Sequence, residues 1–290
     1  MIPAAFDYHA PATLEEAIAL LGSLGEEAKI LSGGQSLLPL LKLRLGEVSD
    51  LVDIGRIEGL EYVREEGDRL LIGGRTTETA LERSDVLRDR YPILLDTARV
   101  IADPLVRNRA TVGGNLAHGD PANDHPATML ALDAEVVATG AAGERVIAVR
   151  EFFTGFFGTA LSTGEILTEI RVPIHQSGDG GAYLKLERKV GDFAAAGAAV
   201  QLRLGSDGTV TSAGIGLTNA GNKPVFAGEA GSFLVGQTPS DDAIAEAARL
   251  ASTAASPSAD RRGSVEYKTT MARVLAERAI RTALERAGGN

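Results

Sequence analysis

The chain has 290 residues, no cysteine and a formal net charge of −10. The absence of cysteine excludes disulfides, thiolate nucleophiles and iron–sulfur clusters held by this chain, so any redox work requires a bound organic cofactor. Lysine and arginine are scattered rather than gathered into a stripe, which argues against nucleic acid as a partner. The length predicts two or three structural units.

The first residues lack the basic and then apolar regions of an export signal. Charged residues interrupt every apolar run before the ~18 residues that a membrane span needs. We therefore expect a cytoplasmic protein without a membrane span.

In the first 55 residues the pattern predicts helix, strand, glycine turn, helix and strand. Thr13 and Glu16 form a capping box that opens a helix, which we expect to end at Gly22. A short strand then leads into the glycine pair at residues 33–34, and residues 49–55 supply a second buried strand.

Residues 56–175 open with a hairpin that we expect to turn at Glu66 and Gly67, followed by a helix that opens near Thr77. A further helical stretch should end around Asp103 and Pro104, because proline disfavours helix in the residue before it. After a second glycine-rich segment the pattern predicts one more helix and three strands.

A glycine-rich break at residues 175–181 marks our preferred domain boundary. Beyond it, alternating apolar residues predict a three-stranded meander, and two helical patterns follow, the first capped by Ser240. The last third is therefore expected to be α+β.

Two glycine pairs stand in similar settings, at residues 33–34 and at residues 113–114. Consecutive glycines expose main-chain N–H groups that can hold an anion, and two such loops can grip one diphosphate. Asp124 is an acceptor and suits a ribose or ribityl hydroxyl better than a phosphate. Each pair taken alone is also compatible with a plain tight turn. Side-chain donors near the two pairs are Ser32, Gln35, Ser36, Thr111 and Asn115.

The segment from His118 to His125 also contains Asp120 and Asp124, a spacing compatible with a divalent metal ion. No third histidine or ligand-bearing helix supports such a site, so loop and helix-cap roles are favoured for both histidines. The chain has neither a G-x-S-x-G elbow nor a G-x-x-x-x-G-K-[ST] motif.

Three motifs occur in order along the chain: SGGQSLLP, TVGGNLAHGDPAND and KLERKVGDFAAAG. Together they resemble the FAD-binding medium subunit of molybdenum hydroxylases, of the carbon monoxide dehydrogenase type within the xanthine dehydrogenase family. The resemblance spans nearly the full chain. The resemblance includes the spacing of about eighty residues between the two glycine pairs. It also includes the segment ADRRGSVEYKTTMARVLAERAI near the end of the chain.

The resemblance implies an α+β fold in which a two-part FAD-binding region of the vanillyl-alcohol oxidase (PCMH) type precedes a C-terminal α+β domain with a three-stranded antiparallel sheet. The corresponding domains are residues 1–55, 56–175 and 176–290. In such proteins the two loops hold the FAD diphosphate, Asp124 lies along the polar chain of the cofactor, and Lys185 matches a position near the flavin. Ile101 and Leu167 match lining positions but are equally compatible with core packing. The implied cofactor residues are Ser32, Gly33, Gly34, Gln35, Ser36, Leu37, Ile101, Thr111, Gly113, Gly114, Asn115, Asp124, Leu167, Lys185 and Phe193.

Two positions depart from the family's pattern. Phe193 stands where relatives often place tyrosine or tryptophan against the isoalloxazine, so stacking is retained but a hydrogen bond from a hydroxyl is lost. Gln35 stands where some vanillyl-alcohol oxidase relatives carry the histidine that attaches flavin covalently. We therefore expect noncovalent FAD.

The implied activity is electron relay. A large partner subunit with a molybdenum cofactor oxidises the substrate, a small partner with two [2Fe–2S] clusters conducts electrons, and FAD on this chain passes them to a quinone or NAD. The assembly expected is a dimer of heterotrimers, and no catalytic side chain or metal is assigned to this chain. Two alternatives remain open: a metal-dependent hydrolase built on the His118 to His125 segment, and a noncatalytic nucleotide-binding assembly subunit.

Overall fold

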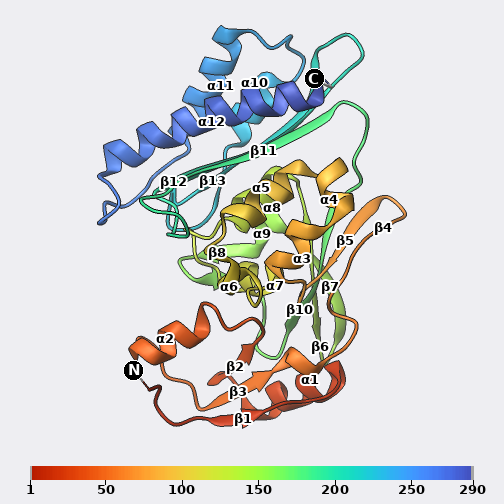
Figure 1. The fold of residues 1–290 in the computed structure, drawn as a ribbon, viewed down its shortest axis with the longest axis vertical. Coiled ribbons are helices and arrows are strands. Elements are labelled where there is room, and N and C mark those ends of the chain that lie inside the picture. Colours follow the sequence, from red (N-terminus) through yellow and green to blue (C-terminus); the bar gives the residue numbers. More distant parts are fainter. Residues whose placement is uncertain (1, 289–290) are drawn as a thin grey trace.

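The computed structural model describes residues 2–288, and three parts follow one another along its long axis (Figure 1). A small N-terminal unit lies at one end, a larger unit occupies the middle, and a sheet covered by helices forms the other end. Within these residues no helix is both long and apolar enough to cross a bilayer.

The N-terminal unit is built on a parallel three-stranded sheet in the order β1-β3-β2. Thr13 caps the first helix by accepting the N–H of Glu16, as predicted. The predicted end at Gly22 is wrong, because the helix continues to Gly25, whose φ of 77° suits a glycine terminator. The elements are β1 (Asp7–His9), α1 (Leu14–Leu24), β2 (Ala28–Leu31), α2 (Leu37–Leu43), β3 (Asp50–Asp53) and the 3-10 turn η1 (Ile54–Arg56).

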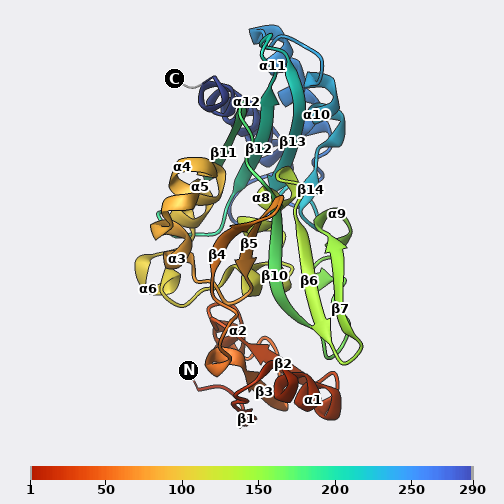
Figure 2. The ribbon, with the colours of Figure 1, turned by 90° about the vertical axis from the view of Figure 1, so that its right-hand side faces the viewer.

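The middle unit holds an antiparallel five-stranded sheet in the order β4-β5-β10-β6-β7. The predicted hairpin is present, with Gly67 and Asp68 between its strands, one position later than expected. Figure 2 shows the sheet with helices α3 to α6 to one side. Its strands are β4 (Val63–Glu66), β5 (Arg69–Gly73), β6 (Glu135–Gly140), β7 (Gly143–Ala148) and β10 (Ile166–Pro173), and a small hairpin adds β8 (Phe153–Gly155) and β9 (Gly158–Thr159).

The helices of the middle unit differ from the sequence prediction at two places. The helix expected to reach Asp103 ends at Val100, and Pro104 begins a separate short helix capped by Asp103. The second glycine pair lies in the first turn of a short helix rather than in an open loop. These helices are α3 (Glu78–Arg83), α4 (Asp85–Arg90), α5 (Pro92–Val100), α6 (Pro104–Arg107), α7 (Val112–Ala117), α8 (His125–Ala131) and α9 (Val149–Phe152).

The C-terminal sheet contains the predicted antiparallel meander of three long strands, and a two-residue strand adds a fourth member at its edge. Helices α10 to α12 pack on this unit, and α12 crosses it in Figure 1. The predicted α+β class is confirmed, whereas the division into domains at residues 55 and 175 stays a prediction. The elements are β11 (Asp179–Leu186), β12 (Ala196–Leu204), β13 (Val210–Thr218), β14 (Val225–Phe226), α10 (Gly228–Leu234), α11 (Asp241–Thr253) and α12 (Val265–Ala287).

Glycines in β13 let the middle unit dock on the C-terminal sheet. A Cβ placed on Gly216 would lie 2.0 Å from the backbone oxygen of Ala127, and one on Gly214 would lie 2.2 Å from that of Ala131. Helix α8 therefore rests directly on the backbone of the strand. Since Asp124 immediately precedes α8, this contact also fixes where that carboxylate lies.

We expect Gly216→Ala to lower the free energy of unfolding by about 1–3 kcal/mol, because the added methyl group forces α8 away from the sheet. Gly22→Ala is the matched control. An added Cβ there meets no heavy atom within 4 Å, and alanine favours a helix interior over glycine by roughly 0.5–1 kcal/mol. Urea denaturation measures both, and an unchanged midpoint for Gly216→Ala would contradict the close docking of α8.

Candidate cofactor-binding site

A cavity of about 350 Å³ lies between the N-terminal and middle units, and both glycine pairs line it. Segments that are about eighty residues apart in the chain therefore face one space. The predicted cofactor residues in its wall are Ser32, Gly33, Gly34, Gln35, Ser36, Leu37, Thr111, Gly113, Gly114, Asn115 and Leu167.

The two loops meet because Gly33 has no side chain. A Cβ at this position would lie 2.1 Å from the backbone oxygen of Arg109 and 2.9 Å from the Cα of Ala110. One residue earlier, the hydroxyl of Ser32 lies 3.0 Å from that of Thr111, so a hydrogen bond joins the loops directly. The sequence motif thus encodes contact between two backbones.

The first loop presents free main-chain donors. Among residues 2–288, the N–H groups of residues 33–36 find no acceptor in the protein. Gly34 has a φ of 74°, which turns the chain sharply between β2 and α2. The side-chain amide of Gln35 bends back toward the oxygen of Gly33, at 3.4 Å. The main chain, more than this glutamine, can therefore hold an anion.

The second glycine pair works differently. The N–H of Gly113 donates to the oxygen of Gly74 at 3.1 Å, and the N–H of Gly114 donates to the Thr111 hydroxyl at 3.2 Å. A Cβ on Gly113 would lie 2.4 Å from the oxygen of Gly74. These N–H groups are thus already used within the chain, and the pair serves close packing of the cavity wall.

Asn115 offers a polar atom to a ligand. Its side-chain oxygen is buried, with no hydrogen-bond partner in the part of the chain that the structure describes. A buried acceptor without a partner is costly, and a ligand hydroxyl would satisfy it. This favours a molecule that carries hydroxyl groups as well as phosphate.

The charge of the cavity wall suits an anion. Lys29 lies in the wall, and none of the residues that line the cavity is acidic, although the whole chain carries a net charge of −10. Lys29 and Gly74 were not predicted. A third glycine pair, at residues 73–74, begins at the last residue of β5, and it is the sequence signal that could have indicated Gly74.

The remaining predicted residues gather elsewhere, where the end of α5 meets the C-terminal sheet. Lys185 donates to the Asp124 carboxylate at 2.9 Å and to the backbone oxygen of Val100 at 3.0 Å. Ile101, next in the chain, is buried. Phe193 belongs to the loop in which Gly191 packs against Ala102, and its side chain is 46% exposed.

Asp124 is tied into the protein more tightly than expected. Besides Lys185, the hydroxyl of Tyr183 donates to it at 2.6 Å, so each carboxylate oxygen already has a donor. Burial raises the pKa of Asp124, and Lys185 and Tyr183 oppose that shift. Asp124 therefore joins the middle unit to β11, and any cofactor hydroxyl would have to share it. Tyr183 was not predicted, although its position two residues before Lys185 on a strand places both side chains on one face.

The histidines of the suggested metal segment do not converge on a common centre. The Nε2 of His125 lies 2.7 Å from the Glu78 carboxylate, and both side chains are fully buried. The ring of His118 packs edge-on against Phe157, and burial lowers its pKa. Within residues 2–288 no three potential metal ligands gather. The metal-dependent hydrolase therefore gains no support from the structure.

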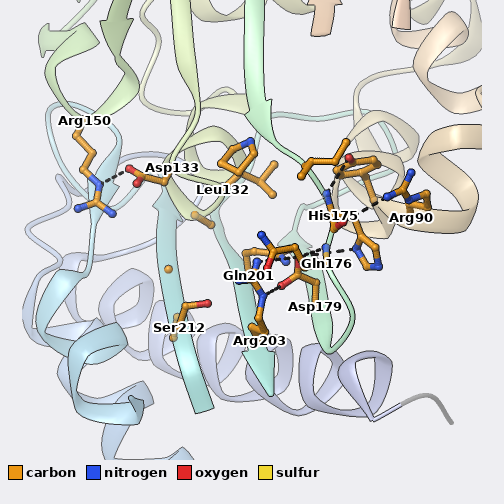
Figure 3. Close-up of a pocket in the computed structure, with 16 residues that line it drawn as sticks. Arg90, Leu132, Asp133, Arg150, His175, Gln176, Asp179, Gln201, Arg203 and Ser212 are labelled. Atoms are coloured by element: carbon orange, nitrogen blue, oxygen red, sulfur yellow. Dashed lines mark hydrogen bonds and ion pairs between the residues drawn. The ribbon is translucent and has the colours of Figure 1, made fainter. Parts of the chain in front are cut away.

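A second cavity, of about 390 Å³, lies where the middle unit meets the strands β11 to β13 (Figure 3). Its arginines have carboxylate partners. Arg203 lies 2.7 Å from Asp179, and Arg150 lies 2.9 Å from Asp133. Arg90 pairs with Glu65 outside the wall. None of the predicted cofactor residues lines this cavity, and each of these ion pairs lies within a single unit of the fold.

The cavity has an anion-favouring wall and forms where the glycine loop after β2 touches the segment that leads into α7. Such a site defines a protein that holds a phosphate-bearing cofactor. The family models identify that cofactor. The FAD binding domain in molybdopterin dehydrogenase matches residues 4–175, and the CO dehydrogenase flavoprotein C-terminal domain matches residues 181–283. The chain belongs to this family of FAD-binding oxidoreductase subunits, and the predicted resemblance is confirmed.

Similar proteins cover the whole chain. The carbon monoxide dehydrogenase medium chain of Afipia carboxidovorans is 47% identical over 287 residues, which are 99% of each chain. The structure of carbon monoxide dehydrogenase from Hydrogenophaga pseudoflava matches with a TM-score of 0.96 at 45% identity, over 99% of both chains. Quinoline 2-oxidoreductase from Pseudomonas putida 86 matches with a TM-score of 0.92 at 33% identity, again over 99% of both chains.

Lys185→Met should lower the free energy of unfolding by about 3–5 kcal/mol, because it leaves the Asp124 carboxylate buried without its cation. The pKa of this carboxyl in the folded state then lies above its unfolded value, so the folded state binds the extra proton. Stability of the variant should therefore rise as the pH falls from about 8 toward about 4, the ordinary pKa of aspartate. Denaturation at several pH values measures this dependence.

The double variant Asp124→Asn, Lys185→Met is the control, since it removes the buried charge together with its partner. The double variant should recover part of the lost stability. Its free energy of unfolding should not rise at low pH through this site, because no titrating carboxyl remains there. Equal stabilities for the single and double variants would contradict the coupling between Asp124 and Lys185.

Proposed function

We propose that this chain is the flavoprotein subunit of a molybdenum-containing hydroxylase or dehydrogenase and relays electrons through noncovalently bound FAD. The observation that carries the proposal is the meeting of the two glycine loops over one cavity that contains Lys29 and no acidic side chain. FAD carries a diphosphate and ribityl hydroxyls. These match the free main-chain N–H groups of residues 33–36 and the buried oxygen of Asn115.

The residues have separate roles in holding the cofactor. The N–H groups of the first loop would bind the diphosphate, while Ser32 and Thr111 keep the loops together. Lys29 adds a positive charge to the cavity wall, although its ammonium group donates to the backbone oxygen of Glu26 at 3.1 Å. The side-chain oxygen of Asn115 would accept a hydrogen bond from a hydroxyl group of the cofactor.

Lys185 and Phe193 would receive the flavin end of the cofactor, as the family resemblance implies. By the same resemblance Asp124 would lie along the polar chain of the cofactor, and Ile101 would line it.

FAD, when bound, accepts electrons from the [2Fe–2S] clusters of a small partner subunit and passes them to a quinone or to NAD. This chain contributes binding, orientation and electrostatics, since the chemistry belongs to the cofactor. The absence of cysteine agrees with iron–sulfur clusters on another chain.

The substrate is handled by a large partner subunit with a molybdenum cofactor. The similar carbon monoxide dehydrogenase from Hydrogenophaga pseudoflava is a form that lacks the Mo-pyranopterin moiety of its molybdenum cofactor, so that enzyme normally uses a molybdenum cofactor, which supports such a partner here. The relatives include a carbon monoxide dehydrogenase and a quinoline oxidoreductase, so the same flavoprotein design serves unrelated substrates. The acceptor, the assembly as a dimer of heterotrimers and the cytoplasmic location remain parts of this proposal.

The purified chain should carry FAD with an absorption band at about 450 nm. Gly33→Val and Gly114→Val should each lower FAD content, with the larger loss for Gly33→Val. At Gly33 the new side chain strikes backbone, and displacing the loop by overpacking costs about 1–3 kcal/mol, which is roughly 5- to 150-fold in affinity. At Gly114 the nearest atom is the Thr111 hydroxyl.

Gly46→Ala is the control, because an added Cβ there meets no atom within 4 Å. FAD content is measured by absorbance after release from the protein. Full retention of FAD in both valine variants would contradict the assignment of the cavity. Reduction of the wild-type flavin by the partner subunits and their substrate separates an electron-relay subunit from a noncatalytic nucleotide-binding one.

A further inference from the structure

The loop between β11 and β12, residues 187–195, carries two exposed apolar residues. Val190 is 89% exposed and Phe193 is 46% exposed. Gly191 has a φ of 85°, and it lies so close to the backbone of Ala102 that an added Cβ would contact that backbone. The loop thus lies on the end of α5, beside the group that contains Lys185 and Asp124.

Asp192 is the fixed point of this loop. Its carboxylate accepts from Arg262 at 2.8 Å and from two nitrogens of Arg188 at 3.0 and 2.9 Å. It also accepts the backbone N–H of Phe193 at 2.9 Å. The Asp192 side chain is 9% exposed, and the hydrogen bond from Arg262, reinforced by Arg188, holds its pKa well below the ordinary value. The carboxylate therefore stays charged at any working pH.

Arg262 is itself held in place by contacts near the start of α12. Arg262 lies in the segment between α11 and α12, where its backbone N–H donates to the Asp260 carboxylate at 2.7 Å. The buried Lys268 of α12 donates to the backbone oxygen of Ser258 at 2.9 Å and lies 2.9 Å from Asp260. The restraint on Asp192 therefore extends to the core of the C-terminal unit.

Phe193 depends on this arrangement for its position. Its ring belongs to none of the buried core clusters among residues 2–288. The Arg262 guanidinium lies 5.7 Å from the ring centre, within range of a cation–π contact. The bond from its N–H to Asp192 fixes the backbone on which the ring is mounted. A partly exposed ring outside the packed core is otherwise freer to change rotamer than a core residue.

We propose that Asp192 is a positioning residue that, with Arg188 and Arg262, holds Phe193 at the flavin end of the cofactor site and so sets how readily an electron acceptor reaches the flavin. This rests on the proposed function, because Phe193 takes its place at the flavin from that assignment. This role requires no contact between Asp192 and the cofactor or the acceptor. Asp192 acts through the aromatic ring.

The test compares Asp192→Asn, Phe193→Ala and the double variant in the full chain loaded with FAD. The flavin is reduced photochemically without oxygen, and its reoxidation by 1,4-benzoquinone is followed by stopped-flow absorbance. Asp192→Asn and Phe193→Ala should each change the reoxidation rate by roughly two- to tenfold, the effect of losing one aromatic contact. The double variant should match Phe193→Ala alone, because Asp192 acts through the ring.

Asp207→Asn is the matched control. Asp207 likewise accepts a backbone N–H and a side chain in its own turn, but that turn lies at the opposite end of β12. It should leave both FAD content and reoxidation unchanged. Arg262→Lys keeps a cation but loses the guanidinium nitrogen that donates to Asp192, and it provides a second test if Asp192→Asn does not fold.

Two results would overturn the proposal. One is reoxidation at the wild-type rate in Asp192→Asn and Arg262→Lys with full FAD content. The other is addition of the effects of Asp192→Asn and Phe193→Ala in the double variant, since that would show independent action. A wild-type chain that binds no FAD refutes the proposed function, and this inference with it, before any variant is compared.

Discussion

The cofactor site depends on the contact of two backbones at Gly33. No side chain separates this residue from the oxygen of Arg109, so the loop that ends one sheet rests directly on the segment that leads into α7. The hydroxyls of Ser32 and Thr111 close the contact with a hydrogen bond. Because one loop belongs to the N-terminal unit and the other to the middle unit, the cavity exists only as long as these two units stay in this register.

The segment of residues 120–125 connects that cavity to the rest of the molecule. The Asn123 side chain donates to the backbone of Asn115 beside the second glycine pair. Asp124 accepts from Tyr183 and Lys185 of the C-terminal sheet, and His125 reaches Glu78 at the start of α3. Short polar side chains suit this task, because each one can bind a different element from a single turn. The density of such residues in the sequence thus reflects a junction where this segment meets α7, α3 and β11.

Local patterns predicted the elements whose signals are contained within a few neighbouring residues. The cap at Thr13 and the meander of the last third follow from side-chain hydrogen bonds and alternation, which the sequence displays directly. The errors occur where two signals compete. Gly22 does not end its helix because an exposed glycine is tolerated inside one, and the glycines at 113–114 enter a helical turn because Thr111 caps it. Family resemblance, rather than pattern, supplied Ile101, Leu167, Lys185 and Phe193.

The sequence by itself determined the class of protein, because three ordered motifs and the absence of cysteine are properties of the chain alone. It also indicated the two loops, since consecutive glycines beside polar residues mark backbone that must be approached closely. Only the tertiary structure decided which N–H groups stay free, that Lys29 and Gly74 share the wall, and that Tyr183 and Lys185 occupy Asp124. Those facts depend on hydrogen bonds and contacts between residues far apart in the chain, and such pairings exist only after the sheets have packed.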